Sequence, residues 1–226
     1  MKRVITALLA ALLVLSLAAC GSGVETKKLA GTWTCTIDVT DRMNAAAEQA
    51  LGLSAADGTA QMPLQLVLTV AEDGAYTLRY DSDAVRTALD AYAAALHPAA
   101  VESVYAAAEE QGFSREEYDA AMEKAGITMD DMVAAIFAGV DEEELLSLLT
   151  GRSAAITGYC RAESGQLYLA DTAAELAETA DCLSYTLSDG TMTWTDAQGE
   201  LSSQLTEQEQ ELLRVPLTWT KQEESK

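Results

Sequence analysis

The sequence predicts an α+β protein in which an eight-stranded antiparallel β-barrel carries an all-helical insertion between its third and fourth strands. Both ends of the chain alternate apolar and polar residues with a period of two, which is typical of half-buried strands. The middle of the chain instead places apolar residues three and four apart, which favours helices. Short turns join most successive strands, and closing eight strands into a barrel removes the exposed sheet edges. An open sheet or a sandwich of the same strands remains an alternative.

Three strands and one helix are predicted before the insertion. Residues 32–39 alternate apolar side chains with threonine and aspartate, which indicates a strand with one buried face. A helix is expected at residues 41–51, and Gly52 follows it as a stop signal. The second strand covers about 62–70. Glu72-Asp73-Gly74 then turns the chain into a third strand that ends near residue 81.

Five more strands are predicted after Gly151. The clearest hairpin has Ser188-Asp189-Gly190 at its turn, because Asp-Gly favours the positive φ angles of a type I′ turn. A second hairpin turns at Glu163-Ser164-Gly165. The five strands are expected at residues 155–161, 166–170, 182–187, 191–196 and 215–221.

The residues between Ser82 and Thr150 predict four or five short helices. Ser114 with Glu117 forms a capping box, and Thr128 with Asp131 caps the helix that follows. We expect the first helix to stop before His97-Pro98 and a second to begin at Pro98. The predicted helices lie at about 83–96, 98–111, 114–125, 128–139 and from 141 onward. They form either a small subdomain with its own core or a lid beside the barrel mouth.

The first twenty residues have the pattern of an export signal. Lys2 and Arg3 precede an apolar run of about 14 residues, which is shorter than the roughly 20 residues needed to span a bilayer. The run ends in Leu17-Ala18-Ala19-Cys20, which resembles the lipobox of bacterial lipoproteins. A transmembrane anchor and a plain cleaved signal are the alternatives. The resemblance implies cleavage before Cys20, acylation of its sulfur, and a protein held on the outer face of the cell membrane.

A second resemblance concerns the barrel. Gly31-Thr32-Trp33 opens the first strand as Gly-x-Trp opens lipocalin-like (calycin) barrels. The later hairpins and the closing Pro216-Leu217-Thr218-Trp219-Thr220-Lys221 are similar to the lipocalin-like domains of exported bacterial lipoproteins. The resemblance covers roughly residues 29–81 and 155–221, and the long insertion departs from it.

These predictions divide the chain into a signal peptide, a tether, a barrel and a helical insertion. From Gly21 to Lys28 the tether spans at most roughly 30 Å when extended, so the barrel is expected close to the membrane. The predicted parts are a signal peptide at 1–19, a tether at 20–28, the barrel at 29–81 and 151–221, the helical insertion at 82–150 and a tail at 222–226.

The chain is strongly acidic. Its 226 residues include 14 Lys and Arg and 36 Asp and Glu. Cleavage before Cys20 removes Lys2 and Arg3, which leaves 12 basic and 36 acidic residues and a formal net charge of −24. This balance argues against nucleic acid as a partner, because phosphate binding requires Lys and Arg patches. It fits a well-solvated exported protein or one with a cationic partner.

No catalytic or metal site is predicted. His97 is the only histidine, it precedes Pro98 in a predicted turn, and no nucleophile motif lies beside it. One histidine and scattered cysteines do not match the ligand spacing of a zinc site. Asp130-Asp131 and residues 141–144 lack the alternating ligands of a calcium loop. Paired carboxylates for glycoside hydrolysis remain a minor alternative, but no pair stands out. We therefore expect no enzyme and no cofactor.

Three cysteines remain in the mature chain besides Cys20. Cys35 shares the expected inner face of its strand with Trp33. Cys160 and Cys182 are expected to point outward from late strands. Because disulfides are permitted outside the membrane, we predict a Cys160–Cys182 disulfide.

The expected inner faces carry six of the 13 aromatic residues, and these rings either line a ligand cavity or fill the barrel. The candidate ligand-lining residues are Trp33, Tyr76, Tyr80, Tyr185, Trp194 and Trp219. The sequence thus predicts a non-catalytic binding lipoprotein for a small apolar ligand or an envelope partner. The alternative is a structural or assembly protein of the cell envelope, with a filled barrel and a partner-binding helical insertion.

Overall fold

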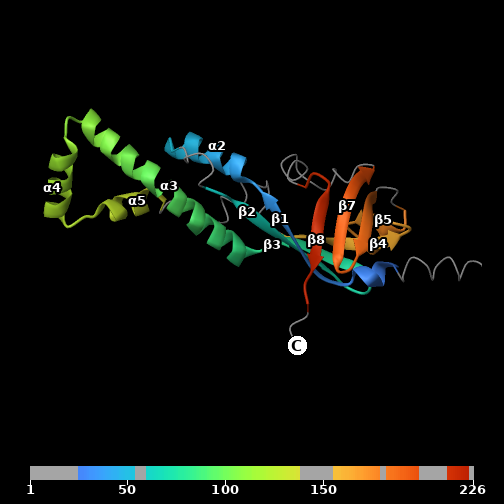
Figure 1. Ribbon diagram of the computed structural model, residues 1–226. Coiled ribbons are helices and arrows are strands. Elements are labelled where there is room, and N and C mark those ends of the chain that lie inside the picture. Colours follow the sequence, from blue (N-terminus) through green and yellow to red (C-terminus); the bar gives the residue numbers. More distant parts are fainter. Residues whose placement is uncertain (1–24, 54–59, 138–154, 179–181, 199–212, 224–226) are drawn as a thin grey trace, which may run out of the picture. The chain divides into compact units, whose positions relative to one another are not determined.

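The protein is an α+β structure whose eight antiparallel strands close into a barrel in chain order, from β1 to β8 (Figure 1). The computed structural model describes residues 25–53, 60–137, 155–178, 182–198 and 213–223. The strands are β1 Gly31–Asp38, β2 Pro63–Val70, β3 Ala75–Tyr80, β4 Ile156–Glu163, β5 Gln166–Ala170, β6 Cys182–Ser188, β7 Thr191–Gln198 and β8 Leu217–Lys221. The predicted eight-stranded antiparallel barrel in up-and-down order is confirmed.

Two tight turns have the backbone that the sequence predicts. Asp189 and Gly190, between β6 and β7, both have positive φ, at 45° and 76°. Ser164 and Gly165, between β4 and β5, repeat this pattern at 53° and 76°. Positive φ at both central residues matches the right-handed twist of the flanking strands, so each pair of strands is joined without a long loop.

The barrel closes through the pairing of β1 with β8, where Trp33 lies opposite Lys221 and Thr34 opposite Thr220. The Lys221 ammonium lies 5.2 Å from the centre of the Trp33 ring. Trp33 and Trp219 are 1% and 0% exposed. Two of the largest side chains of the protein therefore fill the interior close to this seam.

A short helical segment at residues 25–29 is bound to the barrel. The buried backbone N–H of Ala162, in β4, donates to Thr26 Oγ1 at 3.0 Å. The indole N–H of Trp33 donates to the carbonyl of Leu29 at 2.8 Å. The part of the predicted tether from residue 25 onward is thus attached to the barrel by one hydrogen bond from a residue far along the sequence, Ala162, and one from the nearby Trp33.

Helices separate several of the strands. The structure describes α2 Thr40–Leu51, α3 Ser82–Glu110, α4 Arg115–Ala125, α5 Met129–Phe137 and α7 Ala173–Leu176. In chain order, α3, α4 and α5 come between β3 and β4. The short α7 was not predicted, although Thr172 caps it by accepting from the N–H of Glu175. The last predicted helix, from residue 141, lies outside the described residues.

The prediction of two helices that meet at His97-Pro98 is wrong, because α3 runs through Pro98 as one helix of 29 residues. Proline removes one backbone donor and crowds the preceding turn, which disfavours an interior position. Here Leu96 and Ala100, one on each side of Pro98, are both buried. Packing on both sides of the proline outweighs the lost hydrogen bond.

The two predicted caps are confirmed. Ser114 and Glu117 exchange side-chain and backbone hydrogen bonds at the start of α4, which is a complete capping box. At the start of α5, the N–H and hydroxyl of Thr128 donate to Asp131 at 2.8 and 2.7 Å, and the N–H of Asp131 donates to Thr128 Oγ1 at 3.1 Å. Such reciprocal bonds satisfy donors that a helix start would otherwise leave free.

The chain divides into two compact units. Among the described residues, the barrel unit comprises 25–35, 66–80, 155–178, 182–198 and 213–223, and the helical unit comprises 36–53, 60–65 and 81–137. Leu53, Ala100 and Val133 form a buried cluster within the helical unit. Tyr92 of α3 is 2% exposed, and its hydroxyl donates to Asn44 Oδ1 of α2 at 2.7 Å. The helical unit therefore has a core of its own.

Candidate functional site

The barrel unit contains a cavity of about 100 Å³. Side chains from each strand from β2 to β7 contribute to its wall, together with residues just before β8. The wall is almost entirely aliphatic apart from Tyr76, Trp194 and the thiol of Cys160. A partly open space with such a wall is suited to an apolar group, because burial there removes apolar surface from water.

One end of this cavity is closed by the helical segment at 25–29. Leu29 contributes to the wall and is buried, and Thr26 of the same segment is bound to Ala162 near the end of β4. The wall residues with partly exposed side chains include Ile156 at the start of β4 and Val215 just before β8. Because Ala162 and Ile156 lie at opposite ends of β4, the cavity is closed at the segment 25–29 and approaches solvent at the other end.

The six aromatic residues predicted to line a ligand cavity divide into those that border the cavity and those that do not. Tyr76 and Trp194 line the cavity. Trp219 packs its ring against that of Trp194, with centroids 4.8 Å apart and planes at 47°. Trp33 and Trp219 are fully buried but are not among the described wall residues, so they fill space in the barrel.

Tyr80 and Tyr185 are half-buried and also fall outside the described wall. Tyr185 lies directly opposite Trp194. Burial raises the pKa of the Tyr185 hydroxyl, and the negative charge of Glu25 adds to this shift. Of the six candidates, two therefore belong to the cavity.

Cys160 is the wall residue whose position differs most from the sequence prediction. Tyr76 lies opposite Gly158 across β3 and β4, and directly opposite residues share a face of the sheet. Cys160 follows Gly158 by two positions, so it points to the same interior face. The prediction assumed that Tyr159 points inward. Continuing the alternation from Ile156 would have placed Cys160 inside.

The predicted Cys160–Cys182 disulfide is not formed, because Cys35, Cys160 and Cys182 are all free thiols. Cys160 is in β4 and Cys182 is in β6, and β5 lies between these strands. Two strand spacings separate them by about 9–10 Å, whereas a disulfide joins Cα atoms about 4.4–6.8 Å apart. The Cys182 thiol instead donates to Gln166 Oε1 at 3.0 Å.

The buried thiols of Cys160 and Cys35 are poorly reactive. Burial raises the pKa of Cys160 to about 12, and the negative charge of Asp73 adds to the effect. Burial also raises the pKa of Cys35, and a backbone hydrogen bond from Thr218 partly offsets this. Because the thiolate is the nucleophile, a thiol with a raised pKa is a poor one near neutral pH.

Trp194 carries a polar group that is unusual for such an apolar wall. Its indole nitrogen Nε1 is buried and has no hydrogen-bond partner within the described part of the chain, and the same holds for Trp219. Most buried polar groups in proteins are paired, so unpaired donors are exceptions that call for an explanation.

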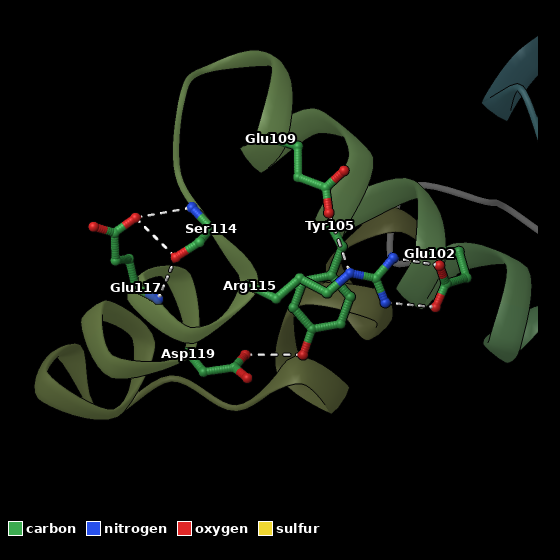
Figure 2. Close-up of polar contacts among 7 residues, drawn as sticks. All are labelled: Glu102, Tyr105, Glu109, Ser114, Arg115, Glu117 and Asp119. Atoms are coloured by element: carbon green, nitrogen blue, oxygen red, sulfur yellow. Dashed lines mark hydrogen bonds and ion pairs between the residues drawn. The ribbon is translucent and has the colours of Figure 1, made fainter.

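A polar network on the helical unit joins α3 to α4 (Figure 2). The guanidinium of Arg115 donates to both carboxylate oxygens of Glu102, at 3.1 and 2.7 Å, and its Nε donates to Glu109 at 3.2 Å. It also lies 4.7 Å from the centre of the Tyr105 ring, and the Tyr105 hydroxyl donates to Asp119 at 2.8 Å. Arg115 thus contacts two carboxylates and one aromatic ring of α3.

These contacts shift the titration of the groups involved. The hydrogen bond and charge of Arg115 lower the pKa of Glu102. The hydrogen bond to Asp119 raises the pKa of Tyr105. The network lies at the surface, where Arg115 and Glu102 have side chains 48% and 64% exposed. The network therefore holds α3 and α4 together, and none of these groups is a buried reactive group.

The sole histidine also makes a surface contact. His97 Nε2 lies 3.1 Å from Asp130 Oδ1, between α3 and α5. Within the described ranges, no group of three or more His, Cys, Asp or Glu side chains is placed to hold a metal ion. No helix among the described residues is sufficiently long and apolar to span a membrane.

Comparison with known proteins adds no relative: no family model, no curated protein and no solved structure matches this chain. The functional argument therefore depends on the residues themselves.

Proposed function

We propose that this chain is a lipid-anchored, extracytoplasmic and non-catalytic binding protein that takes a small apolar group into its barrel. The observation that carries the proposal is the apolar cavity of about 100 Å³ inside a closed barrel. Gly31-Thr32-Trp33 at the start of β1 and eight strands in up-and-down order support a lipocalin-like barrel. The resemblance of residues 17–20 to a lipobox supports the anchor.

The size of the cavity limits the ligand. Apolar cavities of about 150 Å³ stay dry and bind benzene or xenon, whereas drug-sized molecules need about 300–1,000 Å³. The cavity therefore suits a small ring or the end of an alkyl chain, with the rest of a larger ligand outside. Tyr76 and Trp194 supply aromatic surface, and Trp194 also has a buried indole N–H without a hydrogen-bond partner among the described residues.

The proposed anchor fixes which end of the barrel is near the membrane. Five peptide links separate Cys20 from Glu25, so an acylated Cys20 would lie within about 18 Å of the segment that closes the cavity. The open end of the cavity would then point away from the lipid. Two acyl chains on one cysteine give stable attachment where a single chain gives only marginal binding.

The ligand site is tested with toluene as the probe, measured by thermal unfolding of the mature chain. A ligand that binds only the folded state raises Tm with concentration. We expect a saturable rise that is lost in Leu183→Phe, because Leu183 lines the cavity and the larger ring fills it. Leu187→Phe is the matched control, since Leu187 is an exposed position on the same strand. An equal rise in all three proteins, or none in the natural chain, contradicts the ligand site.

The anchor is tested by intact mass spectrometry of the protein recovered from membranes. We expect a mature chain that begins at Cys20 and carries a diacylglyceryl group, and release into the medium for Cys20→Ser. Recovery of an unmodified chain with its first 19 residues attached contradicts the anchor.

The alternative function, an envelope assembly protein with a filled barrel, is favoured by one specific observation. Trp33 and Trp219 are fully buried, while the helical unit exposes Phe113 (47%) and Ile127 (42%) just beyond the two ends of α4. This alternative predicts no response to toluene. It also predicts that Phe113→Ser with Ile127→Ser abolishes cross-linking of the protein to its envelope partner in intact cells.

A further inference from the structure

Helix α4 is the described element of the helical unit that depends least on apolar packing. None of its residues from Arg115 to Ala125 is buried. In contrast, α3 buries six side chains and α5 buries Val133 in the cluster with Leu53 and Ala100. Because tertiary packing of an apolar face supplies most of the stability of protein helices, α4 lacks the usual source.

The contacts of α4 with α3 are polar and aromatic (Figure 2). Arg115 binds Glu102 and Glu109, Tyr105 binds Asp119, and the rings of Tyr105 and Tyr118 meet edge to face at 6.4 Å. We call these six residues the latch. Exposed charge contacts of this kind are individually weak and are screened by salt.

Both ends of α4 have glycines that can serve as hinges. Gly112 before the helix has φ of 88°, and Gly126 after it has φ of 70°. A Cβ atom built at either glycine would have no atom within 4 Å apart from its chain neighbours, so the surrounding space is open. Hinges are typically a few loop residues at element ends that absorb changes in φ and ψ.

The helix itself is well defined once formed. A capping box starts it, and a pair of hydrogen bonds from Gly126 to Glu123 and from Ile127 to Met122 ends it in the Schellman pattern. Even so, a helix of 11 residues is marginal when isolated in water. Losing the latch would therefore both free α4 and expose its backbone to exchange.

From these observations we infer that α4 is an arm held on α3 by the latch, and that it opens about Gly112 and Gly126 while the rest of the helical unit stays folded. The opening is controlled by charge, because Arg115 supplies the cation of every ion pair in the latch. The inference concerns the helical unit and is independent of the ligand site in the barrel.

The test is hydrogen exchange of the full mature chain, followed by mass spectrometry of peptides from α3 and α4. We expect α4 to exchange faster than residues 85–96 of α3, and raising NaCl from 20 mM to 0.5 M to increase the difference. Arg115→Ala should speed exchange in α4 by about fivefold and leave α3 unchanged. Lys124→Ala is the matched control, since Lys124 is a cation in the last turn of the same helix and is not one of the six latch residues.

Three results would overturn the inference: α3 and α4 exchanging at one common rate, exchange of α4 that is indifferent to salt, or equal effects of the two substitutions. Arg115→Lys separates charge from geometry, because lysine keeps the charge but loses the bidentate contact. We expect its α4 to exchange at a rate between those of the natural chain and Arg115→Ala. A rise in α3 exchange together with that of α4 would mean that the whole unit unfolds, which also contradicts an arm.

Discussion

Tyr76 of β3 covers Gly158 directly across the β3–β4 ladder. A Cβ atom at Gly158 would lie 2.9 Å from Cε1 of the Tyr76 ring and 2.4 Å from the carbonyl oxygen of Ala170. A side chain at this position would therefore clash with both the Ala170 carbonyl and the Tyr76 ring, so glycine is required there. Because Tyr76 also lines the cavity, this contact sets part of its wall.

Gly158→Ala should destabilise the protein by about 2 kcal/mol, since overpacking a buried site forces the ring and backbone apart. Urea unfolding measures this change. Thr157→Ala, at the neighbouring exposed position, should change the free energy of unfolding by less than about 0.5 kcal/mol. Equal effects of the two substitutions would show that Tyr76 does not rest on Gly158.

All three thiols of the mature chain outside Cys20 should be free and slow to react. The raised pKa of Cys160, about 12, leaves almost no thiolate at pH 8. Peptide mapping after iodoacetamide treatment at pH 8 should find Cys160 unmodified in the native protein and modified once the protein is unfolded without reductant. Modification that requires a reductant would instead reveal a disulfide.

The same pKa shift predicts loss of stability in alkali. The pKa of Cys160 rises on folding from its ordinary 9.0, so the contribution of the protonated thiol is fully present below pH 9. As the pH rises from 9 toward 12, the unfolded state loses its proton first and gains stability relative to the folded state. Cys160→Ala should flatten this part of the curve of unfolding free energy against pH. A curve that falls equally steeply without the thiol would contradict the assignment.

Acid should loosen the helical unit through three carboxylates. Contacts with Arg115, Ser114 and Thr128 lower the pKa values of Glu102, Glu117 and Asp131 respectively. A lowered pKa stabilises the folded state above the ordinary value and loses that contribution as the pH falls through the folded one. Hydrogen exchange in α4 should therefore accelerate below about pH 4.5, with salt reducing the effect. Exchange corrected for intrinsic rates that stays constant from pH 6 to pH 3 would contradict these contacts.

The Tyr92–Asn44 hydrogen bond should be worth about 1 kcal/mol, because it joins α2 to α3 at a buried ring. Tyr92→Phe and Asn44→Ala, measured singly and together by urea unfolding, form a double-mutant cycle. We expect the two effects to be coupled rather than additive. Strict additivity would show that α2 and α3 are not joined by this bond.

Local patterns allowed much of the barrel to be predicted, and long-range packing explains the errors. Strand β5 was predicted with its exact ends, because Gly165 and the alternation of Leu167 and Leu169 are local signals. The continuous α3 was missed because the burial of Leu96 and Ala100 around Pro98 depends on other parts of the chain. Turn and cap residues act within four positions, so a single sequence carries their signal.

The candidate site was harder to predict than the strands that build it. Alternation identified interior-facing aromatic residues, but it does not tell which of them fill space, as Trp33 and Trp219 do, and which border a cavity. Cys160 was assigned to the wrong face because Gly158 carries no side chain to mark the alternation. The wrong face of Cys160 produced the disulfide prediction, although the strand predicted at 166–170 already separated the two cysteines.

The central claim, an apolar cavity that accepts a small guest, is tested most directly by a crystal structure of the mature chain under xenon pressure. Xenon binds dry apolar cavities of about this size. The account predicts a xenon atom inside the barrel in contact with Cys160, Leu183 and Trp194, and its absence from Leu183→Phe crystals. A barrel without xenon in the natural chain, with side chains filling the space between these residues, would contradict the account.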